Sequence, residues 1–159
     1  MNQADFVSVY RELLPKIGQY LSRRVPLDEV EDIASLVFEV AWQKRSQVTP
    51  GEELPWLYRI AAFQVANFRR RQATFANFLS TTLMPSSAPA AEDLATFDLD
   101  LAAAWKSLSS SEQSLLALVA FEGLSVQDAA IATGISANTA STRLHRARKK
   151  LAAKLQVQD

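Results

Sequence analysis

The sequence has no cysteine and only one histidine among its 159 residues. The lack of cysteine excludes a disulfide framework, a zinc–thiolate site and a thiol redox switch. It also suits the reducing cytoplasm, where we expect the protein to work. We find no Ser/His/acid arrangement, no cluster of metal ligands and no glycine-rich phosphate loop. We therefore expect no metal and no cofactor, and predict that the protein is not an enzyme.

Long apolar runs are missing as well. The longest, LLALVAF at residues 115–121, is far shorter than the roughly 20 residues that a helix needs to cross a bilayer. The first residues, MNQADFVSVYRELLPK, lack the basic start and apolar centre of a signal peptide. We therefore expect no membrane insertion.

The chain carries no net charge, because 17 basic residues balance 17 acidic ones. The two signs are nevertheless segregated along the sequence. Residues 28–39 hold five acids and no base, and residues 92–100 hold four acids and no base. Residues 59–71 hold four arginines and no acid, and residues 136–154 hold six bases and no acid. Such blocks indicate separate surfaces for separate partners.

Helical periodicity dominates the sequence, so we expect an all-α fold without strands. A first helix is predicted over residues 5–24, kinked or split at Pro15. A second begins after Asp28 as N-cap, and a third begins at Pro55 after a loop over residues 44–54. The apolar face of the third helix, predicted to be buried, consists of Leu57, Ile60, Ala61, Val65 and Phe68.

A stretch of small, polar and proline residues, STTLMPSSAPAAE, divides the chain. We predict two small helical domains, 1–79 and 94–159, joined by a flexible linker at 80–93. In the second domain, Ser109 and Ser125 each begin an [ST]-x-x-[DE] capping pattern, and Gly134 ends a short helix. Ser136 then caps a long final helix, which gives the order typical of a helix-turn-helix.

The final helix has two different faces. Its apolar face consists of Ala140, Leu144, Ala147 and Leu151. Its polar face consists of Asn138, Ser141, Thr142, His145, Arg146 and Lys149. Small polar residues come first and long bases follow, as a DNA recognition helix requires. A basic helix near a chain end is often merely solvated, but the capped short helix and glycine turn before it favour DNA binding.

Three stretches resemble one family, the extracytoplasmic-function (ECF) group of bacterial RNA polymerase sigma factors. The family's region 4 resembles LSVQDAAIATGISANTASTRLHRARKKL, and two helices of its region 2 resemble EVEDIASLVFEVAW and PWLYRIAAFQVANFRRR. The resemblance covers nearly the whole chain in the family's order. It implies a sigma factor that binds core RNA polymerase and directs promoter-specific transcription initiation.

The resemblance also implies the surfaces that would do this. The residues matching the helix that docks on the clamp helices of the polymerase β′ subunit are Glu31, Asp32, Ser35, Leu36 and Glu39. Those expected at the minus-ten element of promoter DNA are Arg59, Phe63, Asn67, Arg70 and Arg71. Those expected at the minus-thirty-five element are Ser136, Asn138, Ser141, Thr142, Arg143, His145, Arg146 and Lys149. The polymerase β flap and an anti-sigma factor are further implied partners.

This chain departs from the family's usual residues at several of these positions. Ser35 and Leu36 stand where glutamine and an acid are usual, and Phe63 and Asn67 where asparagine and aspartate are usual. Phe63 lies at the margin of the buried face, so it could pack in the core or stack on an exposed base. The neighbouring arginines, Arg69 included, are expected to contact phosphates.

Two further expectations concern the aromatic residues and the histidine. Trp42, Trp56 and Phe68 are expected in the core, and His145, which has no second ligand one turn away, is expected to face phosphate or solvent. The loop 44–54 corresponds to the family's loop that captures a flipped minus-ten base. The main alternative is a stand-alone helix-turn-helix regulator that binds a palindrome as a dimer.

Overall fold

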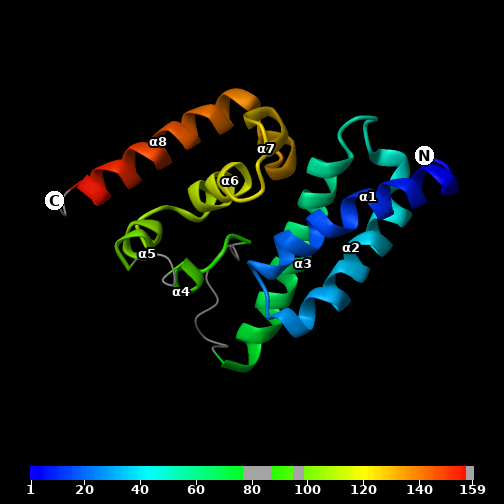
Figure 1. The fold of residues 1–159 in the computed structure, drawn as a ribbon, viewed down its shortest axis with the longest axis horizontal. Helices are drawn as coiled ribbons and strands as arrows, with labels where there is room; N and C mark the ends of the chain where they lie inside the picture. The colour runs from blue at the N-terminus through cyan, green and yellow to red at the C-terminus, as the bar shows by residue number, and fades with distance from the viewer. Residues whose placement is uncertain (77–86, 95–98, 157–159) are drawn as a thin grey trace. The chain divides into compact units, whose positions relative to one another are not determined.

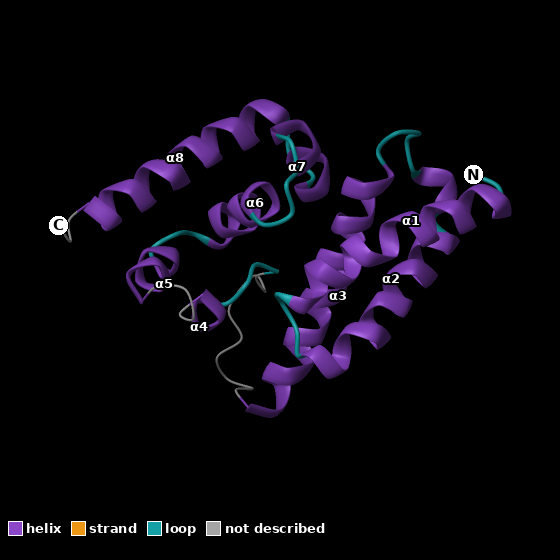
Figure 2. Ribbon diagram, viewed as in Figure 1, coloured by secondary structure: helices purple, strands orange, loops and turns teal. Residues whose placement is uncertain are grey.

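The computed structural model describes residues 1–76, 87–94 and 99–156. Figure 2 shows helices and loops, and no strand, over these residues, so the expected all-α class is confirmed. The chain divides into two compact units, Met1–Ser87 and Ala88–Asp159. Most of the stretch expected as a linker, residues 80–86, lies outside the described residues. Its end belongs to the second unit, because the Trp105 indole N–H donates to the Pro89 carbonyl oxygen at 2.9 Å.

The first unit consists of three helices, α1 (Gln3–Ser22), α2 (Val30–Gln43) and α3 (Glu53–Ala76). Short 3-10 turns, Leu27–Glu29 and Arg45–Gln47, lie between them. Each helix packs against the other two, and they lie side by side in Figure 1. The centre of their core is fully buried and consists of Ile17, Leu21, Val37, Ala41, Leu57, Ala61 and Val65. The five residues predicted as the buried face of α3 are all buried, as expected.

Pro15 does not split α1, which is one continuous helix from Gln3 to Ser22. Of the two expectations, a kink or a split, the split was wrong, because Pro15 lies on the exposed face. Water can therefore solvate the carbonyl oxygen that the missing proline N–H leaves without a donor. Burial of Leu13, Ile17 and Leu21 on the other face holds the helix together across this site.

Two predicted helix starts are displaced by a few residues. Asp28 does not cap α2, because a 3-10 turn occupies Leu27–Glu29 and α2 continues from Val30 with no side-chain cap. Pro55 is the third residue of α3, which begins at Glu53. Proline costs no hydrogen bond there, since the first N–H groups of a helix have no partner within it.

A buried arginine joins distant parts of the first unit. Arg24 is only 5% exposed. Its guanidinium lies 3.6 Å from the Tyr20 ring centroid and donates to the carbonyl oxygens of Tyr20 at 2.9 Å and Ser87 at 2.8 Å. Its own carbonyl oxygen accepts from the Arg69 guanidinium at 2.9 Å. The end of α1, the body of α3 and residue 87 are thereby connected.

The second unit contains α4 (Ala91–Leu94), α5 (Leu99–Lys106), α6 (Ser110–Ala120), α7 (Val126–Thr133) and α8 (Ala137–Gln156). The long helix α8 lies against α5, α6 and α7, as Figure 1 shows. The predicted caps are present: the Ser109 and Ser125 hydroxyl oxygens accept from the N–H groups three residues on. Trp105 of α5 is almost fully buried, so the segment before α6 contributes to the core.

Candidate nucleic-acid interface

The turn between α7 and α8 has the geometry of a helix-turn-helix. Gly134 has φ +73°, in the left-handed region that favours glycine, and ends α7. The N–H of Ile135 then donates back to the Ala130 carbonyl oxygen at 3.0 Å. The Ser136 hydroxyl oxygen accepts the N–H of Thr139 at 3.1 Å and so begins α8. Local chemistry alone therefore sets where the chain turns from α7 into α8.

Helix α8 is buried on one face and exposed on the other, as its sequence pattern predicts. Ala140, Leu144 and Ala147 are at most 1% exposed, and Leu151 is half-buried. The predicted polar face is exposed at every position, namely Asn138, Ser141, Thr142, His145, Arg146 and Lys149. The apolar face packs against the other helices of the unit, which leaves the polar face open to a partner.

The basic residues of α8 are in two different situations. His145, Arg146, Arg148 and Lys149 are exposed, and none of the described carboxylates lies within ion-pair distance of them. Arg143 and Lys150 instead contact α6: Arg143 donates to the Ser111 hydroxyl oxygen and Lys150 to the Glu112 carboxylate, each at 2.9 Å. The four exposed side chains can therefore contact phosphates, while Arg143 and Lys150 also help to hold α8 in place.

The polar side chains at the start of α8 are partly engaged with the helix itself. Thr142 donates its hydroxyl to the Asn138 carbonyl oxygen at 3.0 Å, and Ser136 donates to the Thr139 hydroxyl oxygen at 2.9 Å. Asn138, Thr142 and Arg146 line a shallow hollow on the exposed face. The Asn138 and Ser141 side chains are exposed, so they can present hydrogen-bonding groups outward.

Glu112 is a structural residue of this interface that the sequence pattern revealed only in part. Its side chain is 7% exposed, and one carboxylate oxygen accepts both the Ser109 N–H and the Lys150 ammonium at 2.9 Å. Burial alone raises the pKa of this carboxyl, but the hydrogen bonds from Ser109 and Lys150 outweigh it, and the pKa lies below its ordinary value. The capping pattern predicted the bond to Ser109, whereas Lys150 is 38 residues away in sequence.

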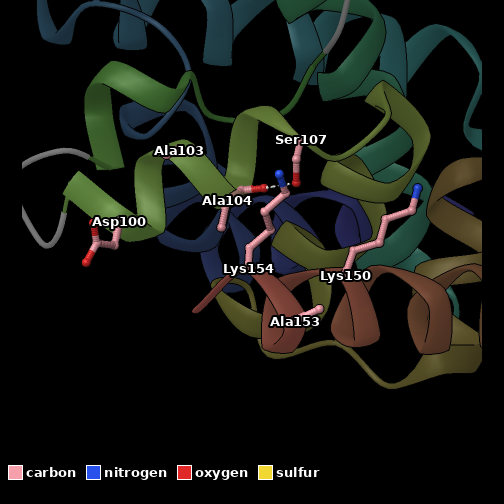
Figure 3. Close-up of a pocket in the computed structure, with 7 residues that line it drawn as sticks. All are labelled: Asp100, Ala103, Ala104, Ser107, Lys150, Ala153 and Lys154. Carbon is pink, nitrogen blue, oxygen red and sulfur yellow. Dashed lines mark hydrogen bonds between the residues drawn. The ribbon is translucent and has the colours of Figure 1, made fainter. Parts of the chain in front are cut away.

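A second hollow of this unit lies between α5 and α8 (Figure 3). Alanines from both helices line it, and Lys154 extends from α8 toward α5. Lys150 also lines it, but its ammonium group bonds Glu112 of α6. Asp100 lies at its other end, on α5.

In the first unit, α3 exposes the residues expected at the minus-ten element. Arg59, Phe63, Asn67, Arg70 and Arg71 are all exposed, and Phe63 is 62% exposed. Phe63 therefore does not pack in the core, and the first of the two roles considered for it is excluded. Arg69 is half-buried, and its guanidinium donates to the Arg24 carbonyl oxygen at 2.9 Å, so it serves the fold. Its expected contact with phosphates stays a prediction.

The acidic residues of α2 are also exposed on one face. Glu31, Asp32, Ser35 and Glu39 face solvent, and Leu36 is 38% exposed. Ser35 donates its hydroxyl to the Glu31 carbonyl oxygen at 3.1 Å, so its side chain lies back along the helix. The face therefore combines carboxylates with one apolar side chain.

The aromatic residues expected in the core are only partly there. Phe68 is 8% exposed, but Trp42 and Trp56 are only half-buried. Trp42 packs edge-on against Phe6, and the Arg45 guanidinium covers its ring at 3.8 Å. Arg45 belongs to the loop 44–54, so this stacking anchors one end of that loop.

No group of three His, Cys, Asp or Glu side chains that could hold a metal ion occurs in residues 1–76, 87–94 and 99–156. None of the helices described is both long and apolar enough to cross a membrane.

These features define a helical protein with a helix-turn-helix and separate acidic and basic faces. The sigma-70 region 4 family matches residues 99–151. The RNA polymerase sigma factor NccH of Alcaligenes xylosoxydans xylosoxydans is 31% identical over 161 residues, covering 92% of this chain and 87% of the relative. The chain therefore belongs to the RNA polymerase sigma factors, in their extracytoplasmic-function group, and directs promoter-specific transcription initiation by core RNA polymerase.

Two solved structures share the fold. The sigma factor RpoE of Bartonella quintana, solved with the anti-sigma factor NepR, has a TM-score of 0.65 and 24% identity, covering 98% of this chain and 99% of that one. CnrH, solved with the cytosolic domain of CnrY, has a TM-score of 0.66 and 23% identity, covering 99% and 92%. The alternative of a stand-alone regulator receives no support from these comparisons.

Proposed function

We propose that three exposed faces divide the work of this sigma factor. The polar face of α8 binds the minus-thirty-five element, the basic face of α3 binds the minus-ten element, and the acidic face of α2 binds the polymerase β′ clamp helices. The observation that carries this proposal is the polar face of α8, which is exposed along its length. Its basic side chains at His145, Arg146 and Lys149 have no carboxylate within ion-pair distance in the described structure.

The order of side chains along α8 supports a division between bases and phosphates. A recognition helix enters the major groove with its first turns, where short polar side chains such as Asn138 and Ser141 reach base edges. Arg146 and Lys149 come two to three turns later, where a helix in the groove approaches the backbone. Arg143 has a double role, since its contact with Ser111 holds the guanidinium beside this face.

The acidic face of α2 suits a basic partner surface. Glu31, Asp32 and Glu39 concentrate negative charge on one side of a helix whose other side is buried. Charge complementarity of this kind accelerates association and selects the partner. Leu36, partly exposed within the acidic face, supplies the apolar contact that a stable interface needs at its centre.

The protein is also proposed to be controlled by an anti-sigma factor and to act in the cytoplasm, together with RNA polymerase. The support is the shared fold with two sigma factors solved as complexes, one of them with an anti-sigma factor. It is not an enzyme in this proposal, because it supplies promoter specificity to the polymerase and no chemistry of its own.

Transcription in vitro with core polymerase and a promoter library tests the assignment of α8. Asn138→Ala and Ser141→Ala should change the preferred minus-thirty-five bases, each lost contact being worth about 1–3 kcal/mol. Arg146→Ala should weaken binding to all promoters alike. It should also lower the slope of log affinity against log salt concentration by about one. Lys154→Ala, on the same helix but away from the polar face, is the matched control. An unchanged base preference in both the Asn138 and Ser141 variants would refute the assignment.

Binding of charge-reversal variants to core polymerase tests the assignment of α2. Glu31→Lys and Asp32→Lys should weaken binding to core polymerase in the absence of DNA, because each replaces a favourable charge with a repulsive one. Glu12→Lys, an exposed acid of α1, is the control for net charge. Equal losses in all three variants would show that only overall charge matters and that α2 has no special role.

A further inference from the structure

One basic side chain of α8 is held by a helix that lies outside the helix-turn-helix. The Arg143 guanidinium donates to the hydroxyl oxygen of Ser111, in the first turn of α6, at 2.9 Å. The two residues are 32 positions apart in the sequence. Ser111 is exposed and Arg143 is half-buried. Because water competes for a hydrogen bond at the surface, the contact adds little to stability, and its main effect is to fix one long side chain.

The bond to Ser111 places Arg143 at one edge of the polar face of α8. With about 3.6 residues per turn, Arg143 lies between the buried Ala140 and the exposed Arg146 around the helix. It lines the same shallow hollow as Thr142 and Arg146, so two guanidinium groups one turn apart border one polar depression. The front of a recognition helix meets base edges, and basic side chains along its flank reach phosphates.

The Arg143 side chain keeps most of its hydrogen-bonding capacity for a partner. A guanidinium carries several N–H donors, and within the described residues only Ser111 accepts from this one. No described carboxylate lies within ion-pair distance of it, whereas Lys150 is paired with Glu112, the residue next to Ser111. A hydroxyl carries no charge, so Ser111 orients the guanidinium without neutralising it. Phosphate, which can accept two parallel bonds from a guanidinium, is the group that Arg143 matches best.

We propose that Ser111 is a positioning residue for binding of the minus-thirty-five element. It orders the Arg143 side chain in the free protein, so that the guanidinium is ready to contact a DNA phosphate. This inference rests on the proposed binding of α8 to that element. It adds that α6 contributes to affinity without touching DNA. An arginine loses rotamer freedom when it binds a partner, and a side chain that is already ordered loses less.

The test measures how tightly the complex of sigma factor and core polymerase binds paired DNA fragments that contain the minus-thirty-five element. Ser111→Ala should weaken binding by about 2- to 12-fold, the range for ordering one side chain on association. Ser111→Thr keeps the hydroxyl and should retain the parental affinity. Ser110→Ala is the matched control, because Ser110 is an exposed serine of the same turn whose side chain makes no hydrogen bond within the described residues.

Combined variants show whether Ser111 acts through Arg143. Arg143→Ala should weaken binding and lower the slope of log affinity against log salt concentration by about one, because one phosphate contact is lost. In the Arg143→Ala background, Ser111→Ala should have no further effect. Ser111→Ala alone should leave the slope unchanged, since Arg143 still reaches the same phosphate once the DNA is bound.

Several results would overturn the inference. Parental affinity of Ser111→Ala refutes it, and so does an equal loss with and without Arg143, because Ser111 would then act independently. Weaker binding of Ser111→Ala to core polymerase without DNA would make Arg143 a protein contact. Reduced hydrogen-exchange protection of residues 99–156 in Ser111→Ala would mean that the bond holds the helices together instead of orienting a side chain.

Arg146→Ala, measured on the same fragments, tests the role of α8 separately. If Arg146→Ala lowers the affinity and the salt slope while Ser111→Ala has no effect, α8 remains at the minus-thirty-five element and only the positioning is refuted. If neither Arg146→Ala nor Arg143→Ala changes the affinity or the slope, the proposed role of α8 is refuted and the inference with it.

Discussion

Replacing Glu112 tests how α8 is held in position for promoter binding. This nearly buried carboxylate accepts the Ser109 N–H and the Lys150 ammonium on one oxygen. The charge-assisted bond to the Ser109 N–H is worth about 1.5–3 kcal/mol. The pair with Lys150 is worth only about 0.2–1 kcal/mol, because the lysine side chain is 51% exposed and water screens its charge.

These magnitudes predict which of two substitutions at Glu112 lowers stability more. Glu112→Ala removes both contacts, so the free energy of unfolding of the second unit should fall by about 2 kcal/mol. Glu112→Gln can still accept the Ser109 N–H but loses the charge, so it should cost about 1 kcal/mol or less. Hydrogen exchange of residues 99–156 in the full-length protein under increasing urea measures this unit separately from the first.

The stabilisation by Glu112 should decrease as the pH falls. Because the pKa of Glu112 is lower in the folded protein, the ionised carboxylate stabilises the fold above the ordinary carboxyl pKa of about 4.3. That stabilisation is lost as the pH falls through the lowered folded-state pKa, where the parent and Glu112→Gln should become equally stable. A difference that persists at more acidic pH, or parental stability of Glu112→Ala at pH 7, would refute this account of Glu112.

Two further substitutions test the cores of the units. Leu144→Ala, at a position 1% exposed on the buried face of α8, should lower the free energy of unfolding of the second unit by about 2–5 kcal/mol; parental hydrogen exchange in residues 99–156 would contradict that burial. Arg24→Lys should destabilise the first unit, because a lysine cannot replace the planar guanidinium that lies on Tyr20 and bonds two carbonyl oxygens. Hydrogen exchange of residues 3–76 measures this, and full retention of protection would show that charge alone suffices at Arg24.

Interactions between side chains close in sequence determined where several helices begin and which face of α8 is polar. The caps at Ser109, Ser125 and Ser136 depend on groups three residues away, and the two faces of α8 follow from its period. These features could be predicted because a helix brings residues i, i+3 and i+4 together wherever it lies. The stretches similar to sigma factors also lie within single helices or adjacent pairs of helices, so the sequence alone indicated the family.

The tertiary structure decided which polar side chains are free to bind a partner. Arg69 and Arg70 are neighbours in one basic run, yet Arg69 bonds the carbonyl oxygen of Arg24, 45 residues away, and Arg70 is exposed. Arg143 is held by Ser111, 32 residues away. Phe63 could have packed or faced solvent, and only the placement of α1 and α2 against α3 left it exposed. A helical period gives the direction of a side chain, but the helices that pack around it determine whether it is covered.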